Sequence, residues 1–384
     1  MAVIHFLNVK QGDCTFIKHN DGKVTVIDVC NAFKENNTYG KSLYQSLAPR
    51  FGVLPKPHNN PYSSLALPSI LGRPENHAAL GLSNFYGSLD QSALGLSSLF
   101  RTSGNLGLLE KSRVNYNQKE SPVNPIIYLK KHNITGVFRF ILTHPDMDHM
   151  DGLKDFFEEF QPINFWDINN DKEIDSFKSQ RSIDDWEFYK KLRDGKIKTT
   201  RLTVYNGAKG KYYNEDEQGK IGGNGLHILA PSKELVRLSK ETDDYNDCSY
   251  VILYRTGNYK ILFAGDSHDK TWEYILSNYE NDVKNIDLLI APHHGRDSDR
   301  SYDFLDILKP TLTFFGNAKS EHLAHSEWNN KRLEKITNNQ GNCLIAKIDE
   351  SMDIFVTHKD FAEDYTHNNT YFDNEALGWY IKTL

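Results

Sequence analysis

The chain opens with three short runs in which apolar and polar residues alternate, at residues 3–9, 14–18 and 23–29. A period of two is typical of β-strands that bury one face. The Gly-Asp and Asn-Asp-Gly sequences between the runs are typical of hairpin turns. The pattern therefore predicts an antiparallel meander at the amino terminus.

The alternation then stops, and residues 33–122 are rich in Asn, Ser, Gly, Leu and Pro without a sustained helical or strand period. The sequence Ala-Leu-Gly-Leu-Ser occurs at residues 79–83 and again at 93–97, but two copies are too few for a repeat architecture. Irregular segments of this length are usually functional or disordered. We expect an insertion that acts as a lid, serves as an oligomer arm or is partly disordered.

Apolar periodicity resumes at residue 125 and predicts that helices and strands alternate to the end of the chain. The expected helices are 125–131, 153–160, 184–193, 270–279, 302–308 and 327–336. The expected strands are 136–142, 226–229, 248–255, 260–263, 287–290, 311–315, 343–348 and 352–356. An all-β start followed by this alternation predicts two mixed β-sheets covered by outer helices, with residues 1–384 forming one domain.

The composition is that of a soluble protein, with 39% apolar and 25% charged residues among 384. No apolar run is long enough to cross a bilayer, and the amino terminus lacks the features of a signal peptide. Cysteines 14, 30, 248 and 343 form no close pair, which indicates reduced thiols and a cytoplasmic location. The net charge of −6 excludes a molecule that binds polyanions over its whole surface.

Potential metal ligands are concentrated in the segment His144-Pro145-Asp146-Met147-Asp148-His149, directly after an apolar run. A loop that follows a strand is held rigidly and can direct several side chains into one pocket. Carboxylates so close together repel each other, and a bound cation removes that repulsion. The segment predicts a divalent-metal site.

The pattern His-x-Asp-x-Asp-His resembles the His-x-His-x-Asp-His signature of the metallo-β-lactamase superfamily, with Asp146 at the second histidine. Together with residues 6–13, it resembles the C-terminal nuclease-like domain of ComEC competence proteins and their free-standing relatives. Similar motifs follow in the family's order at residues 26–29, 246–251, 262–266 and 291–295. Asn8, Lys10 and Ser326 depart from the family's preferred residues, and the insertion has no counterpart.

The resemblance implies a metallo-β-lactamase αββα sandwich with two divalent metal ions per chain. It assigns the first ion to His144, Asp146 and Asp247, the second to Asp148, His149 and His293, and the bridging position to Asp266. His227 competes with Asp247 as third ligand of the first ion, although a core histidine bonded to the backbone is the simpler reading. We expect Asp13 and Asp28 to orient ligand histidines and His294 to lie behind the ligands or face the substrate. The oxygen-rich set suits Mn²⁺ as well as Zn²⁺.

The expected activity is hydrolysis of a phosphodiester by a hydroxide that bridges the two ions. Asp148 and His325 are the expected catalytic groups, and the expected substrate is DNA, RNA or a nucleotide. Basic residues that could hold its phosphate are Arg296, Arg300, Lys319 and His322. The alternatives are hydrolysis of a non-phosphate ester or lactone, and a non-catalytic interaction module. We expect no membrane partner, and a homo-oligomer or protein contact could form through residues 33–122.

Replacing residues 35–120 by a short Gly-Ser linker tests the role of the insertion. A lid predicts a changed preference for substrate size with metal retained, because the cleft would lose its cover. An oligomer arm predicts a lower molecular mass. Turnover of substrates of different length and light scattering measure these outcomes, and an unchanged protein would show that the insertion is passive.

Overall fold

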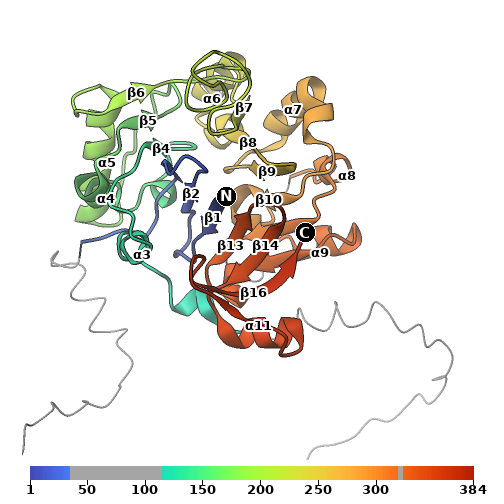
Figure 1. Cartoon of the computed structure of the whole chain (residues 1–384). Helices are drawn as coiled ribbons and strands as arrows, with labels where there is room; N and C mark the ends of the chain where they lie inside the picture. The colour runs from blue at the N-terminus through green and yellow to red at the C-terminus, as the bar shows by residue number, and fades with distance from the viewer. Residues whose placement is uncertain (35–114, 299, 319–322) are drawn as a thin grey trace, which may run out of the picture. The chain divides into compact units, whose positions relative to one another are not determined.

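Two β-sheets packed face to face form the framework of the computed structural model, which describes residues 1–34, 115–298, 300–318 and 323–384 (Figure 1). These residues belong to one of two compact units, Met1–Leu47 with Lys111–Leu384. Most of the expected insertion, residues 35–114, lies outside the described residues. Its expected roles therefore remain predictions.

The larger sheet has ten strands in the order β15-β16-β14-β13-β1-β2-β3-β4-β5-β6. Its strands are β1 (Ala2–Phe6), β2 (Thr15–Lys18), β3 (Val24–Ile27), β4 (Arg139–Ile141), β5 (Asn164–Trp166), β6 (Thr200–Leu202), β13 (Leu344–Ile348), β14 (Met352–Val356), β15 (Phe372–Asp373) and β16 (Gly378–Thr383). The expected meander β1-β2-β3 is antiparallel, whereas β3 to β6 are parallel.

The smaller sheet has six strands in the order β12-β11-β10-β9-β8-β7. Its strands are β7 (Leu226–Ala230), β8 (Val251–Thr256), β9 (Tyr259–Phe263), β10 (Leu288–Ile290), β11 (Leu312–Phe315) and β12 (Lys335–Thr337). Strands β9 to β12 run parallel, and β7-β8-β9 are antiparallel. Both sheets are therefore mixed, as expected.

Alternation along the strands separates the central core from the two outer layers. Ile4 and Phe6 of β1 pack with Phe263 and Phe314 of the smaller sheet in the core between the sheets. Helices α3 (Pro125–Lys131), α4 (Leu153–Phe160) and α5 (Gln180–Arg193) cover the larger sheet. Helices α7 (Asp269–Val283), α8 (Phe304–Leu308) and α9 (His325–Asn330) cover the smaller one. This arrangement confirms the predicted αββα sandwich.

Further elements of the described residues are α6 (Lys233–Thr242), α10 (Asn338–Gly341), α11 (Lys359–Thr366) and the short turns η2 (Gln118–Glu120), η3 (Met147–His149), η4 (Asn246–Cys248) and η5 (Pro292–Gly295).

The expected helix 327–336 is wrong in its second half. Helix α9 ends at Asn330, Arg332 has a φ of 57°, and the chain then enters β12. Ile336 is buried in the inter-sheet core there, so tertiary packing overrides the local helical pattern.

The longest helix of the described residues, α7, has 15 residues and carries several charged side chains. In that part of the chain, no helix combines the length and the apolar character needed to cross a bilayer.

Gly12 allows the loop after β1 to touch the segment that carries the metal-ligand motif. A Cβ atom at Gly12 would lie 2.0 Å from the backbone oxygen of Asp148. We therefore expect Gly12→Ala to lower the free energy of unfolding by about 1–3 kcal/mol, because the two loops must separate. Gly136→Ala is the matched control, since nothing lies within 4 Å of a Cβ there. Urea denaturation measures both, and equal effects would contradict this reading of the contact.

Candidate metal centre

The motif residues lie on loops that follow the carboxyl ends of neighbouring strands. Asp28 follows β3 and His144 follows β4, two parallel neighbours of the larger sheet. Asp266 follows β9 and His293 follows β10, two parallel neighbours of the smaller sheet. The backbone N–H of Tyr250 donates to the Thr143 oxygen at 3.0 Å and joins the loops of the two sheets. The fold thus brings segments that are distant in sequence to one place.

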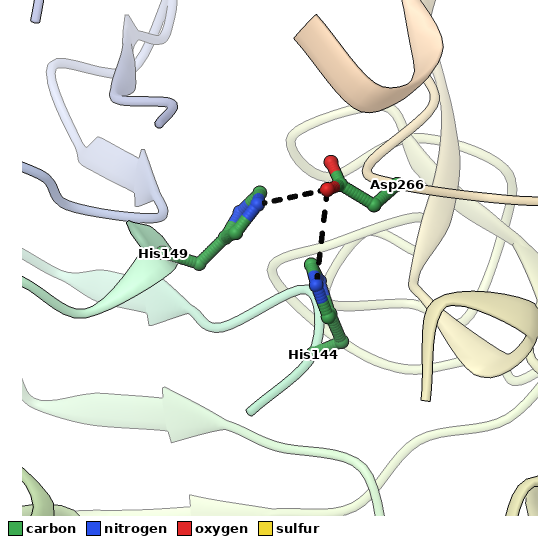
Figure 2. Close-up of side chains that lie close together, drawn as sticks. All are labelled: His144, His149 and Asp266. Atoms are coloured by element: carbon green, nitrogen blue, oxygen red, sulfur yellow. Dashed lines mark ion pairs between the residues drawn. The ribbon is translucent and has the colours of Figure 1, made fainter. Parts of the chain in front are cut away.

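Asp266 is the centre of this cluster. Its Oδ2 atom lies 3.3 Å from His149 Nε2 and 3.9 Å from His144 Nε2, and both rings point toward it in Figure 2. The same oxygen lies 3.6 Å from His294 Nε2 and 3.7 Å from His293 Nε2. Four imidazole nitrogens therefore surround one carboxylate oxygen whose residue is only 2% exposed.

Two carboxylates of the motif complete the cluster. Asp148 Oδ2 lies 3.6 Å from His294 Nε2, and Asp146 Oδ1 lies 3.8 Å from His144 Nε2. Asp146 also forms an ion pair with Lys172, whose ammonium lies 5.4 Å from the Tyr245 ring centroid. No pattern in the sequence indicates Lys172, because it lies in an irregular segment between β5 and α5.

The donor atoms of the cluster fit a divalent cation. His144 with His149 and Asp266, Asp148 with His149 and His294, and Asp13 with Asp266 and His294 each bring three donor atoms within 4.8 Å of one another. The buried Nε2 atoms of His144, His149 and His294 have no hydrogen-bond partner. Buried polar atoms are almost always paired, so converging donors without a protein partner fit a bound cation. Nitrogen and carboxylate donors without thiolate suit Zn²⁺ or Mn²⁺.

Carboxylates behind two of the histidines fix their orientation. Asp28 Oδ2 lies 2.8 Å from His149 Nδ1, and Asp13 Oδ1 lies 2.8 Å from His294 Nδ1. Asp28 also accepts hydrogen bonds from the backbone N–H and the hydroxyl of Thr143. A carboxylate that accepts Nδ1–H leaves the Nε2 lone pair free for a metal ion. Asp13 and Asp28 therefore have the geometry of orienting residues.

The electrostatics of the cluster favour positive charge. Burial lowers the pKa of His149, but Asp266 and Asp28 more than compensate and raise it well above its usual value. His294 behaves alike, because Asp13 and Asp266 raise its pKa despite its burial. Burial raises the pKa of Asp266, yet His149 and His294 hold it well below its usual range. The carboxylates thus create a negative potential that a cation would neutralise.

Other expected site residues lie apart from these three ligand groups. Asp146 and His293 border the groups without belonging to them. Asp247 Oδ1 is buried and unpaired, but Asp247 belongs to none of the groups and pairs with none of their residues. His227 lines a separate pocket with Arg255 and Asp282 on the outer side of the smaller sheet. His325 stacks on Phe315, with ring centroids 5.7 Å apart. Burial, with Lys335 nearby, lowers the pKa of His325 to about 4.

Lys319 and His322 lie outside the described residues, so their expected phosphate contacts stay predictions. Arg296 and Arg300 differ in their surroundings. Arg296 is exposed and lines the cleft above the cluster, whereas Arg300 is buried and bonds to His293.

The cleft above the cluster has a volume of about 1130 Å³. Asp146 and Asp148 form part of its wall. Its lining also includes the acidic residues Glu120, Asp151, Glu173 and Asp175 and five basic ones, Lys10, Lys119, Lys172, Lys178 and Arg296. Lys119 belongs to the carboxyl-terminal end of the expected insertion, so this end of the insertion contributes to the cleft.

No protein-family model and no curated protein matches the sequence. Among solved structures, a diphosphatase of the PhnP family is similar, with 11% identity, a TM-score of 0.36 and coverage of 91% of this chain and 98% of that one. Igni18, a metallo hydrolase from the archaeon Ignicoccus hospitalis, has 12% identity, a TM-score of 0.33 and coverage of 56% and 81%. A CmlA β-hydroxylase mutant has 9% identity, a TM-score of 0.37 and coverage of 90% and 54%. Because these similarities are distant, the fold assignment rests on the strand order and the clustered ligands of this chain itself.

Replacing Asp28 by Asn tests whether the carboxylate behind His149 supports metal binding. Asparagine tolerates the φ of 57° at this position, so the backbone should persist. We expect the affinity for Mn²⁺ or Zn²⁺ to fall about 10–100-fold, because the amide no longer fixes His149 by charge. Equilibrium dialysis measures the affinity, with Asp349→Asn, an exposed carboxylate, as the control. Unchanged affinity in Asp28→Asn would remove this role from Asp28.

Proposed function

We propose that this chain is a metal-dependent hydrolase that cleaves phosphodiester bonds. The observation that carries the proposal is the convergence of buried, unpaired imidazole nitrogens from two loops on the Asp266 carboxylate of a third. A purely structural cluster would pair these atoms with each other or with the backbone. Their common focus instead supports a site built to hold cations.

The proposed ligands fall into two groups that share Asp266. His144 and Asp146 belong to the first group, and Asp148, His149 and His294 to the second. Two divalent ions held there would lower the pKa of a water molecule and neutralise charge on the substrate oxygens. Asp13 and Asp28 would keep the Nε2 atoms of their histidines directed at the ions.

The cleft supports a substrate that carries negative charge. Lys10, Lys178 and Arg296 are exposed on its wall, whereas the carboxylates of Asp146 and Asp148 lie next to the ligand histidines. Basic groups near an acidic, cation-binding floor can hold phosphate oxygens on either side of the scissile bond. The cleft volume is at the upper end of that of small-molecule sites, which suits a nucleotide or a short stretch of nucleic acid. The exposed basic groups lie among acidic residues of the same cleft, so any grip on such a substrate would be local.

Removing single proposed ligands tests the assignment. We expect Asp266→Ala and His149→Ala each to reduce turnover of bis(4-nitrophenyl) phosphate at least about 100-fold, because each variant loses a group that holds the cations. Elemental analysis should find fewer than the wild-type number of ions, which we expect to be two per chain. Circular dichroism should show the fold intact.

His367→Ala, at an exposed histidine after α11, is the matched control and should keep wild-type turnover. A wild-type protein that turns over substrate without bound metal, or a His149→Ala variant with normal metal and turnover, would overturn the proposal. Parallel assays with DNA, RNA, cyclic nucleotides and a lactone would separate the phosphodiester reading from the ester alternative.

A further inference from the structure

The two adjacent histidines of the turn η5 are held in a strained backbone. His293 has φ 52° and ψ 47°, and His294 has φ 59° and ψ 11°. Two consecutive non-glycine residues in the left-handed region are rare and persist where the surrounding structure enforces them. The turn sends the two rings to different partners.

His294 has the surroundings of a metal ligand. Its ring is 1% exposed, its Nδ1 lies 2.8 Å from Asp13, and its Nε2 faces Asp148 and Asp266 at 3.6 Å each. The carboxylate of Asp13, an ion-pair partner at 2.8 Å, favours the proton on Nδ1. The free lone pair is then on Nε2, which faces the other ligands.

His293 has the opposite arrangement of protons. Arg300 Nη2 lies 2.8 Å from His293 Nδ1, and a guanidinium can only donate a hydrogen bond. His293 Nδ1 must therefore accept, so the proton of the neutral ring is on Nε2. A protonated Nε2 has no lone pair for a metal ion.

Arg300 is held firmly in this role. The residue is 7% exposed, its Nη1 donates to the Ser267 backbone oxygen at 2.5 Å, and its Nη2 also donates to Ser298 Oγ at 3.1 Å. The backbone N–H of His293 donates to the Gly265 oxygen at 2.9 Å, which ties the turn to the loop that carries Asp266. The His293 side chain nevertheless keeps 16% of its surface exposed, so a bound molecule can reach it.

We propose that His293 and His294 have different roles in the site. His294 binds metal, and His293, fixed by Arg300 with its proton on Nε2, donates a hydrogen bond to a phosphoryl oxygen of the substrate beside Asp266. A preorganised donor at that position stabilises the negative charge that grows during phosphoryl transfer. This inference rests on the proposed hydrolase function.

Metal binding separates the two roles without any need for turnover. Chelator-treated wild type, His293→Ala, His294→Ala and the control His367→Ala are titrated with Mn²⁺ in equilibrium dialysis. We expect His293→Ala to match wild type within about twofold, and His294→Ala to lose at least about tenfold in affinity for one ion. Loss of an ion in His293→Ala would overturn the inference.

The tautomer of His293 is directly observable by long-range ¹H–¹⁵N correlation of the histidine side chains. We expect a protonated Nε2 and an unprotonated Nδ1 for His293, with the signal identified by its loss in His293→Ala. Arg300→Met should change this signal and leave that of His367 unchanged. A His293 ring protonated on Nδ1 in the wild type would contradict the assignment, whatever the activity of the protein.

Turnover of bis(4-nitrophenyl) phosphate tests the contact with substrate. We expect His293→Ala to lower kcat about 10²–10³-fold with metal retained, as removal of one charge-stabilising donor does. His293→Gln should recover part of this loss, because its amide N–H can reach a similar position. Unchanged kcat in His293→Ala would refute the contact. Failure of the wild type to bind metal or turn over any substrate would refute the proposed function, and the tautomer measurement would still decide the assignment of His293.

Discussion

The structure depends on the burial of one carboxylate, Asp266, among four imidazole rings. A buried charge is strongly unfavourable unless neighbouring groups compensate it. Compensation here requires the loops after β4, β9 and β10 to reach a common point from two different sheets. Gly265 makes the approach feasible, because a Cβ atom at that position would lie 3.0 Å from the Tyr250 oxygen and 3.2 Å from the Thr143 Cβ. The chain topology that brings these loops together is therefore also what compensates the buried charge of Asp266.

Much of this arrangement was predictable from the sequence. The alternating runs at the start predict the meander, and helix 153–160 coincides with α4 (Leu153–Phe160). The clustered ligands of residues 144–149 predict a metal site, because a bound cation removes the repulsion between neighbouring carboxylates. The common location of Asp28, His144 and Asp266 was implied by the family resemblance, because the pattern of residues alone predicts no strand order.

Other features depend on contacts that a local pattern does not encode. The role of Lys172 arises from an ion pair with Asp146, 26 positions away. The proton on His293 is set by Arg300, and neither residue alone reveals it. Strand β12 is a strand because Ile336 packs in the inter-sheet core, although its segment continues a helical pattern. The short strands β5 and β6, with three residues each, are too brief to show any period.

The convergence of ligands from both sheets links the stability of the protein to its surroundings by mass action. An ion that binds only where these loops meet is released when the chain unfolds. Free metal at 100 times its dissociation constant therefore adds about 2.7 kcal/mol to the free energy of unfolding. The same chain would be less stable in a metal-poor environment and more stable in a metal-rich one. Its lifetime, as well as its activity, would therefore depend on the concentration of divalent ions.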